Sequence, residues 1–257
     1  SGVLPVCLGQ GTRIVQFLMN TTKSYRAEIE LGVTTDTYDT SGEITRQTDP
    51  SGVSREKVES ALVSFRGDIQ QIPPEYSAVK YHGRPLYQWA RAGIKVETKS
   101  RPAKIYRLEL IEFKSPVATI EVECGKGTYI RSLAHDLGQN LGCGASLKSL
   151  VRLHCGPFDV RDSISLPELE AAFQYGYWQR LVRPIDTALS HWAAVVVNDD
   201  TGRLIRNGSP LVLGKDDSPA LPPADNRCRA YTSDGRLIGL LRFDPEREQW
   251  QPEKVFG

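Results

Sequence analysis

One arginine of this sequence stands where its charge is unfavourable. Arg131 falls in the first turn of a helix predicted from Tyr129 to Gly142, at the border of its apolar stripe. A cation there opposes the helix dipole by about 0.3–1 kcal/mol, and the edge of a core adds a desolvation cost. We therefore expect a carboxylate or phosphate partner for its guanidinium. That partner is either a local acid such as Asp136, in a purely structural ion pair, or a group that belongs to a functional site.

Tyr25 is a second candidate. It begins a strand predicted over residues 24–33, where apolar and charged residues alternate. The alternation places its ring on the apolar face with Ala27 and Ile29. The ring is either an ordinary core tyrosine or a ring at the mouth of a cleft, where it would stack on a base with its hydroxyl free.

A third feature is a basic segment with interleaved aromatic rings. Between Pro74 and Arg107, eight Lys and Arg residues face only two Glu residues, although the whole chain has a net charge of +1. The basic residues include Lys80 and Arg84, and the interleaved aromatic residues include Tyr76, Tyr81, Tyr87 and Trp89. Basic side chains neutralise phosphates while rings stack on unpaired bases, so the composition favours an RNA-facing segment over a merely solvated face.

The hydrophobic pattern indicates the elements that position these residues. Residues 3–8 are predicted as a short buried strand, and residues 105–113 and 117–124 as two further strands. Helices are predicted over residues 11–20, 54–66 and 166–175, with Ser54 as an N-cap. After residue 190 the strand candidates 193–197, 228–232 and 237–243 alternate with turns, and residues 216–226 form a Pro-containing loop. The pattern predicts a mixed α/β domain followed by a small β-rich module.

Several function classes are excluded. The five cysteines form no C-x-x-C pair and are not bracketed by His at zinc-site spacing, which favours reduced thiols in a cytoplasmic protein and no metal. Gly125-Lys126-Gly127 lacks the Ser or Thr of a P-loop, and Gly9-Gln10-Gly11 lacks the third glycine of a dinucleotide motif. No apolar run is long enough to predict a transmembrane helix.

A series of short motifs follows one order along the chain. Residues 1–6 with Gly9–Thr12 come first, and the later motifs are Lys23-Ser24-Tyr25-Arg26, Leu31-Gly32, Thr35-Asp36-Thr37, Phe65-Arg66-Gly67, Gln71-Ile72-Pro73-Pro74, Tyr76–Lys80, Arg101-Pro102 and Cys124–Arg131. This series resembles the TruB-type pseudouridine synthases, and its first motif is similar to the segment that directly follows the G-x-L-D-P-x-A loop of that family. The likeness runs to about residue 160 and is weaker over the tail.

The resemblance implies a pseudouridine-synthase fold of the mixed α+β type, with a largely antiparallel sheet. It implies a catalytic domain over residues 1–190, a thumb-like insertion at about 74–104, and a PUA-like RNA-binding module over residues 191–257. The implied reaction is isomerisation of uridine 55 in the tRNA T loop, without metal or organic cofactor, by a monomer with no membrane partner. A flipped base enters the cleft at a cost of a few kcal/mol.

The resemblance also assigns roles to residues. Tyr25 would stack on the target base, and Arg131 would hold the catalytic carboxylate. Tyr129 and Leu150 would line the uracil pocket with Arg152 nearby, while Lys80, Arg84 and Tyr76 would contact RNA.

The nucleophilic aspartate of the family pattern would lie a few residues before Ser1, and it is not among these 257 residues. Asp36 and Asp39 belong to a polar turn over residues 34–42, and we do not expect either to substitute for it. We therefore expect the parent enzyme to be active and this chain alone to be inactive. Two alternatives remain: a non-catalytic RNA-binding or RNA-folding protein, and an RNA-guided synthase, which the long insertion and compact tail disfavour.

Overall fold

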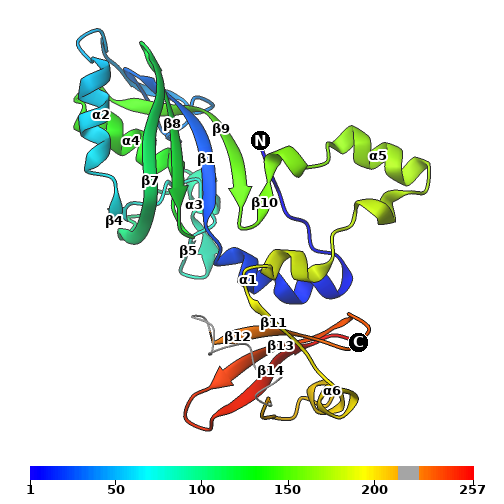
Figure 1. The fold of residues 1–257 in the computed structure, drawn as a ribbon. Helices are drawn as coiled ribbons and strands as arrows, with labels where there is room; N and C mark the ends of the chain where they lie inside the picture. Colours follow the sequence, from blue (N-terminus) through cyan, green and yellow to red (C-terminus); the bar gives the residue numbers. More distant parts are fainter. Residues whose placement is uncertain (214–225) are drawn as a thin grey trace. The chain divides into compact units, whose positions relative to one another are not determined.

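The computed structural model describes residues 1–213 and 226–257. The loop predicted at 216–226 lies outside the described residues except for Asn226. The chain folds into two compact units (Figure 1). The first consists of Ser1–Pro5 with Met19–Ser163, and the second of Val6–Leu18 with Ile164–Gly257. The functional domains predicted as 1–190 and 191–257 stay a prediction.

The first unit is built on a six-stranded sheet in the order β10-β9-β1-β8-β7-β4, with every neighbouring pair antiparallel. Its strands are β1 (Lys23–Leu31), β4 (Gly67–Gln71), β7 (Arg101–Lys114), β8 (Val117–Cys124), β9 (Ala145–Cys155) and β10 (Phe158–Asp159). A separate two-stranded pair joins β2 (Val33–Thr35) and β3 (Ile44–Gln47). The expected mixed α/β fold with an antiparallel sheet is confirmed.

Two helices, α2 (Arg55–Val63) and α4 (Ile130–Asn140), pack on the sheet and close the core of this unit. Ile29, Leu62 and Leu133 are almost fully buried in that core. The alternation along β1 turns Ala27 and Ile29 into it and leaves Arg26 exposed, as the sequence predicts. The Ser54 hydroxyl accepts a hydrogen bond from the Lys57 N–H, so the predicted N-cap of α2 is confirmed.

Helix α4 lies very close to the start of β9, and a glycine makes this approach possible. A Cβ atom at Gly138 would lie 2.1 Å from the Ala145 backbone nitrogen, so any side chain would push the helix away from the strand. Because Arg131 sits two turns earlier on α4, this contact fixes its height relative to the sheet.

The insertion between β4 and β7 is slightly shorter than predicted. Gln71 pairs with Arg101, so the segment that leaves the sheet covers residues 72–100, and the predicted residues 101–104 belong to β7. The insertion contains a tight hairpin, β5 (Lys80–Tyr81) with β6 (Arg84–Pro85), followed by α3 (Leu86–Arg91). Its turn places His82 and Gly83 at positive φ, which suits the right-handed twist of a two-residue hairpin.

The second unit contains a four-stranded sheet in the order β11-β12-β13-β14. The strands are β11 (Ala193–Val196), β12 (Arg227–Tyr231), β13 (Leu237–Asp244) and β14 (Gln249–Val255), and α6 (Asp199–Arg206) contributes Ile205 to their core. The other elements of the unit are η1 (Gly9–Ile14), most of α1 (Val15–Met19), α5 (Leu166–Gln174), η3 (Trp178–Leu181) and η4 (Ile185–Leu189). A further short helix, η2 (Val160–Asp162), closes the first unit.

Some local predictions were wrong or incomplete. The expected buried strand at residues 3–8 does not form, and Leu4, Val6 and Leu8 are mostly exposed, because the segment crosses from one unit to the other. Strands β4, β9 and β14 and helix α6 were not predicted. In β9 a run of charged and polar residues interrupts the period on which a strand prediction rests.

Candidate functional site

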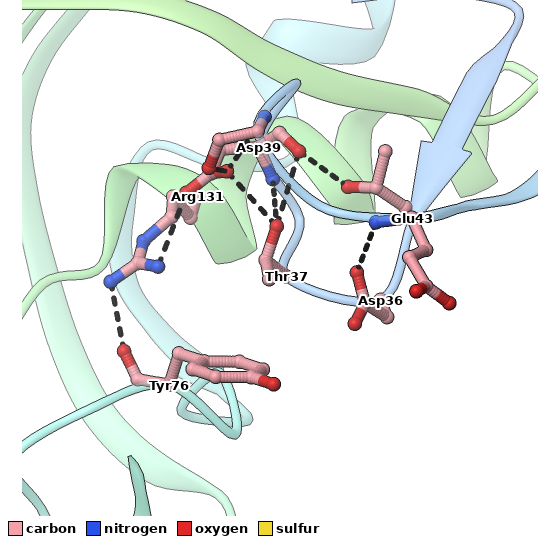
Figure 2. A network of polar contacts seen from close by, with 8 residues as sticks. Asp36, Thr37, Asp39, Glu43, Tyr76 and Arg131 are labelled. Atoms are coloured by element: carbon pink, nitrogen blue, oxygen red, sulfur yellow. Dashed lines mark hydrogen bonds and ion pairs between the residues drawn. The ribbon is translucent and has the colours of Figure 1, made fainter. Parts of the chain in front are cut away.

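Arg131 projects from the first turn of α4 between two acceptors that come from distant parts of the chain. One terminal nitrogen (Nη1) lies 3.3 Å from Asp39 Oδ2, and the other (Nη2) donates to the Tyr76 carbonyl oxygen at 2.9 Å. Figure 2 shows the side chain reaching from the helix toward both. It remains 29% exposed. The prediction that this cation requires an acceptor is confirmed.

The acceptor is not the one predicted for a structural pair. The sequence left two alternatives open, a local acid such as Asp136 or a group of a functional site, and the contacting acid is Asp39, which lies in a polar turn with no expected role. The turn reaches Arg131 because it packs on β9: Leu147 donates its N–H to the Tyr38 carbonyl, and the Thr40 N–H donates to the Leu147 carbonyl. Asp136 is half-buried instead, and burial raises its pKa.

Asp39 is held by its own turn before it meets the arginine. Its Oδ1 accepts a hydrogen bond from the Thr37 hydroxyl at 2.9 Å (Figure 2). The same oxygen accepts from the N–H and the hydroxyl of Ser41. Burial alone would raise the pKa of Asp39, but these bonds, together with Arg131, hold it below its ordinary value. The carboxylate is therefore ionised at neutral pH and fixed in direction.

The arginine keeps donors for a further partner. A guanidinium carries five N–H groups. Only two contacts, with Asp39 and with the Tyr76 carbonyl, are described for Arg131, and the Asp39 contact is a single long one. Asp39 and the Tyr76 carbonyl form a frame that orients the cation and leaves it able to bind a second carboxylate or a phosphate.

The start of α4 is anchored by two polar side chains. The buried Gln71 amide accepts from the Tyr129 N–H at 3.0 Å and donates to the Tyr129 carbonyl at 3.2 Å. The Ser132 hydroxyl donates to the Ile72 carbonyl at 2.7 Å. These bonds satisfy groups at a helix end whose N-cap, Tyr129, supplies no side-chain bond. Sequence reasoning missed both roles; a Gln two positions before the Pro73-Pro74 pair was the available signal.

Tyr25, Leu150 and Arg152 lie together at the junction of β1 and β9. Tyr25 pairs with Arg152 in the register of the two strands, and Ala27 pairs with Leu150. The half-buried side chains of Tyr25 and Leu150 pack against the core of the first unit. Burial raises the pKa of Tyr25, and the Arg152 guanidinium opposes that rise only in part. The phenol therefore keeps its proton at neutral pH.

The first residues of the chain run along the same part of β9. The Ser1 amino group donates to the Leu150 carbonyl at 3.0 Å, and the Val3 N–H donates to the Arg152 carbonyl at 3.0 Å. The Arg152 side chain in turn donates to the Val3 carbonyl at 2.6 Å. Gly2 is required here, because a Cβ atom would lie 2.4 Å from the Arg152 backbone. Arg152 is therefore a neighbour of both the start of the chain and Tyr25.

The hairpin of the insertion exposes its charges. Lys80 and Arg84 are exposed, Tyr76 is half-buried, and the Arg84 guanidinium lies 5.8 Å from the Trp89 ring centre. The Trp89 ring nitrogen donates to the Tyr81 carbonyl at 3.3 Å, which ties α3 to the hairpin. Basic and aromatic side chains therefore lie next to one another in this hairpin, and the RNA-facing role of the segment stays a prediction. Tyr76 contributes its carbonyl to Arg131 and thereby connects the insertion to α4.

Among residues 1–213 and 226–257, no group of three or more His, Cys, Asp or Glu side chains is arranged to hold a metal ion. Over the same ranges, no helix combines the length and the apolar character needed to cross a membrane.

Two family models match the chain in succession. The N-terminal domain of the TruB family of pseudouridylate synthases matches residues 1–130, and the C-terminal domain of tRNA pseudouridylate synthase B matches residues 131–190. The chain belongs to the TruB family. Its fold is therefore that of a pseudouridylate synthase family, which is an isomerase family.

Curated relatives agree with this membership. The chain is 43% identical over 257 residues to a tRNA pseudouridine synthase B of Dehalococcoides mccartyi, covering all of this chain and 83% of the relative. It is 40% identical over 243 residues to the tRNA pseudouridine synthase B of Stutzerimonas stutzeri, covering 93% of this chain and 77% of the relative.

Solved structures share the fold. A Cbf5-Nop10-Gar1 complex matches with a TM-score of 0.73 and 26% identity over all of this chain and 73% of the other. An H/ACA ribonucleoprotein bound to a substrate RNA that contains 2′-deoxyuridine matches with a TM-score of 0.69, at 23% identity and with the same coverage.

Proposed function

We propose that this chain forms the base-binding part of a stand-alone, cytoplasmic and monomeric enzyme that isomerises the uridine at position 55 in the T loop of tRNA. The observation that carries the proposal is the frame around Arg131, where an ionised Asp39 and a backbone carbonyl orient a cation that keeps free donors. The curated relatives named tRNA pseudouridine synthase B support tRNA as the substrate.

In this proposal the catalytic carboxylate binds the free side of Arg131. A nucleophilic carboxylate must be ionised and correctly aimed, and a fixed guanidinium achieves both because it favours the charged form and accepts bidentate geometry. Asp39 is then the group that holds the arginine, not the nucleophile, since Thr37 and Ser41 already occupy its Oδ1.

Tyr25 stacks on the uracil ring in the proposed complex. Its hydroxyl keeps its proton and can donate a hydrogen bond to the uracil, which fixes the orientation of the ring. Leu150 and Tyr129 would line the uracil pocket, and Arg152 would position the base or its phosphate. A base in a loop is flipped at least cost, which suits a T-loop target.

The insertion grips the RNA. Lys80 and Arg84 extend from the hairpin with their charges exposed, and Tyr76 lies at its root beside Arg131. We also propose that residues 191–257 act as a PUA-like RNA-binding module, appended to a catalytic domain of residues 1–190.

The experiment measures release of tritium from carbon 5 of uracil in T-arm RNA. We expect no release by the Ser1–Gly257 polypeptide alone, because the family pattern places the nucleophile before Ser1. The same polypeptide preceded by a segment with the G-x-L-D-P-x-A loop should release tritium, since Ser1 begins beside Leu150, next to Tyr25. Release by the shorter polypeptide would overturn the assignment of the nucleophile.

A second candidate function is RNA binding or RNA folding without catalysis, which the exposed charges of the hairpin suit equally well. A variant of Arg131 distinguishes the two functions. In the longer polypeptide, Arg131→Ala should lower the rate of tritium release by about 10³-fold but leave RNA affinity nearly unchanged if the chain serves an isomerase. If the longer polypeptide binds RNA and never releases tritium, the non-catalytic function is the correct one.

A further inference from the structure

Two aromatic rings form a second link between the same two segments that Arg131 and Asp39 join. The rings of Tyr38 and His135 stack with centroids 3.9 Å apart and an interplanar angle of 18°. Tyr38 directly precedes Asp39 in the turn, and His135 lies four residues after Arg131 on α4. Positions four apart lie one above the other on a helix, so the stack and the ion pair are neighbouring contacts.

The turn holds Tyr38 in an unfavourable backbone conformation to make this stack. Tyr38 has φ of 63°, a left-handed conformation that is unusual for a residue with a bulky side chain. Such a conformation persists only where the surroundings over-determine it. Here the Leu147 N–H donates to the Tyr38 carbonyl, and the Thr35 hydroxyl donates to the Asp39 carbonyl at 2.7 Å. The strained residue is the one that points a ring at α4.

The ion pair is too weak to hold the two segments by itself. Its partners are 29% and 24% exposed and make a single contact of 3.3 Å. Partly exposed pairs of this kind contribute little to stability, because solvent screens them. A stacked aromatic pair stabilises a contact beyond what the area that it buries contributes. The stack is therefore at least as strong a link as the pair that it accompanies.

His135 is oriented by stacking and not by a hydrogen bond at Nδ1. This nitrogen is buried and has no hydrogen-bond partner within the described part of the chain. Burial lowers the pKa of His135, so the ring is neutral at neutral pH. Burial also raises the pKa of the Tyr38 hydroxyl, and the nearby Asp136 and Glu75 carboxylates add to that rise. A phenyl ring at position 135 would keep the stack and remove the orphaned nitrogen.

We propose that Tyr38 and His135 are positioning residues, which clamp the turn of residues 36–42 onto α4 and so keep Asp39 in register with Arg131. This inference rests on the proposed function, because register matters only if Arg131 must present its free side to a carboxylate. It adds two residues, one at each end of a non-polar contact, that act through the ion pair without touching the substrate.

The variants separate ring contact from backbone strain. His135→Phe retains a stacking ring, and His135→Leu fills similar space without one. Tyr38→Phe retains the ring without its hydroxyl. Tyr38→Gly removes the ring and at the same time relieves the positive φ, so a loss of register there cannot be assigned to backbone strain.

The first readout is independent of activity and of the nucleophile. In the 257-residue chain, the pKa of Asp39 and the side-chain Nε–Hε resonance of Arg131 are followed by NMR. We expect His135→Leu and Tyr38→Gly to raise the pKa of Asp39 toward its ordinary value and to move the Arg131 resonance, whereas the two Phe variants match the wild type. In an Asp39→Asn background, His135→Leu should no longer move that resonance.

The second readout is tritium release by the longer polypeptide that carries the G-x-L-D-P-x-A loop. We expect His135→Leu to lower kcat by about 10- to 100-fold with little change in KM, because misplaced reacting groups slow the step without weakening RNA binding. His135→Phe should restore kcat. A wild type without tritium release contradicts the proposed function, and the NMR readout then still decides the clamp.

The clamp is wrong if His135→Leu folds with a wild-type Asp39 pKa and an unmoved Arg131 resonance. It is also wrong if His135→Phe and His135→Leu are equally impaired, since the contact would then depend on histidine chemistry. Where Tyr38→Gly fails to fold, the pair of His135 variants gives the answer alone.

Discussion

Arg131 and Arg84 carry the same charge, yet their surroundings differ. Arg131 lies on a helix that a buried glutamine and a glycine contact fix in place, and it meets a carboxylate and a carbonyl of distant segments. Arg84 lies on a two-stranded hairpin, exposed, with an aromatic ring as its described neighbour. A cation in a fixed frame can orient one reacting group, whereas an exposed cation attracts phosphates without fixing any atom.

The comparison predicts its largest effect at Arg131. Arg131→Ala in the longer polypeptide should lower the rate of tritium release by about 10³-fold, because the catalytic carboxylate loses its oriented donor. Arg131→Lys should be almost as slow, since an ammonium lacks the planar fork of donors that binds a carboxylate through two parallel hydrogen bonds. Single-turnover tritium release measures both. A rate for Arg131→Ala within tenfold of the wild type would contradict the role.

The next largest effect is on stability, at the glutamine that anchors the start of α4 and so positions Arg131. Gln71→Ala should lower the free energy of unfolding by about 2 kcal/mol, because the Tyr129 N–H loses its acceptor at a half-buried helix start and the Tyr129 carbonyl keeps only the Leu133 N–H as donor. Urea unfolding measures the change, and Gln70→Ala, at the exposed neighbouring position, is the matched control. Equal stabilities of the two variants would show that α4 does not depend on Gln71.

For the exposed hairpin we expect a smaller effect, on RNA affinity and not on the rate of the reaction. Lys80→Ala with Arg84→Ala should reduce the salt slope of RNA affinity by about 0.7–0.9 for each phosphate that is no longer neutralised, and leave the rate of tritium release at saturating RNA nearly unchanged. Arg55→Ala with Lys57→Ala removes the same charge from α2 and should leave the slope intact. If both double variants reduce the slope equally, the insertion is not a dedicated RNA-binding element.

The smallest effect is a pH dependence of stability near the frame. The pKa of His135 is lowered in the folded state by burial, so the unfolded chain binds a proton more readily. Its contribution to stability is complete above the unfolded pKa of about 6.5 and is lost as pH falls below that value toward the folded pKa. Urea unfolding from pH 7.5 to pH 5 should therefore show a steeper loss for the wild type than for His135→Phe. Parallel curves would place His135 in a more hydrated site.

Much of the fold follows from local patterns. The alternation in residues 24–33 and 117–124 and the stripe of α4 predicted β1, β8 and the helix, because burial on one face imposes a period that a short window reveals. Strand β9 was not predicted, because its own residues show no clear strand period and it is pairing with β1 that holds it extended. The prediction for residues 3–8 was wrong because apolar content does not decide whether a segment is covered.

For the site, the amino-acid pattern was enough to establish that Arg131 needs an acceptor and that Tyr25 faces the core side of its strand. Those conclusions depend only on helix and strand geometry and on the cost of an unpaired charge. The folded chain was needed to identify that acceptor as Asp39, 92 residues away, and to place Tyr38 against His135 beside it. The reason is physical: which polar groups meet depends on how a turn packs against β9 and α4, and no period in the sequence encodes a contact between segments so far apart.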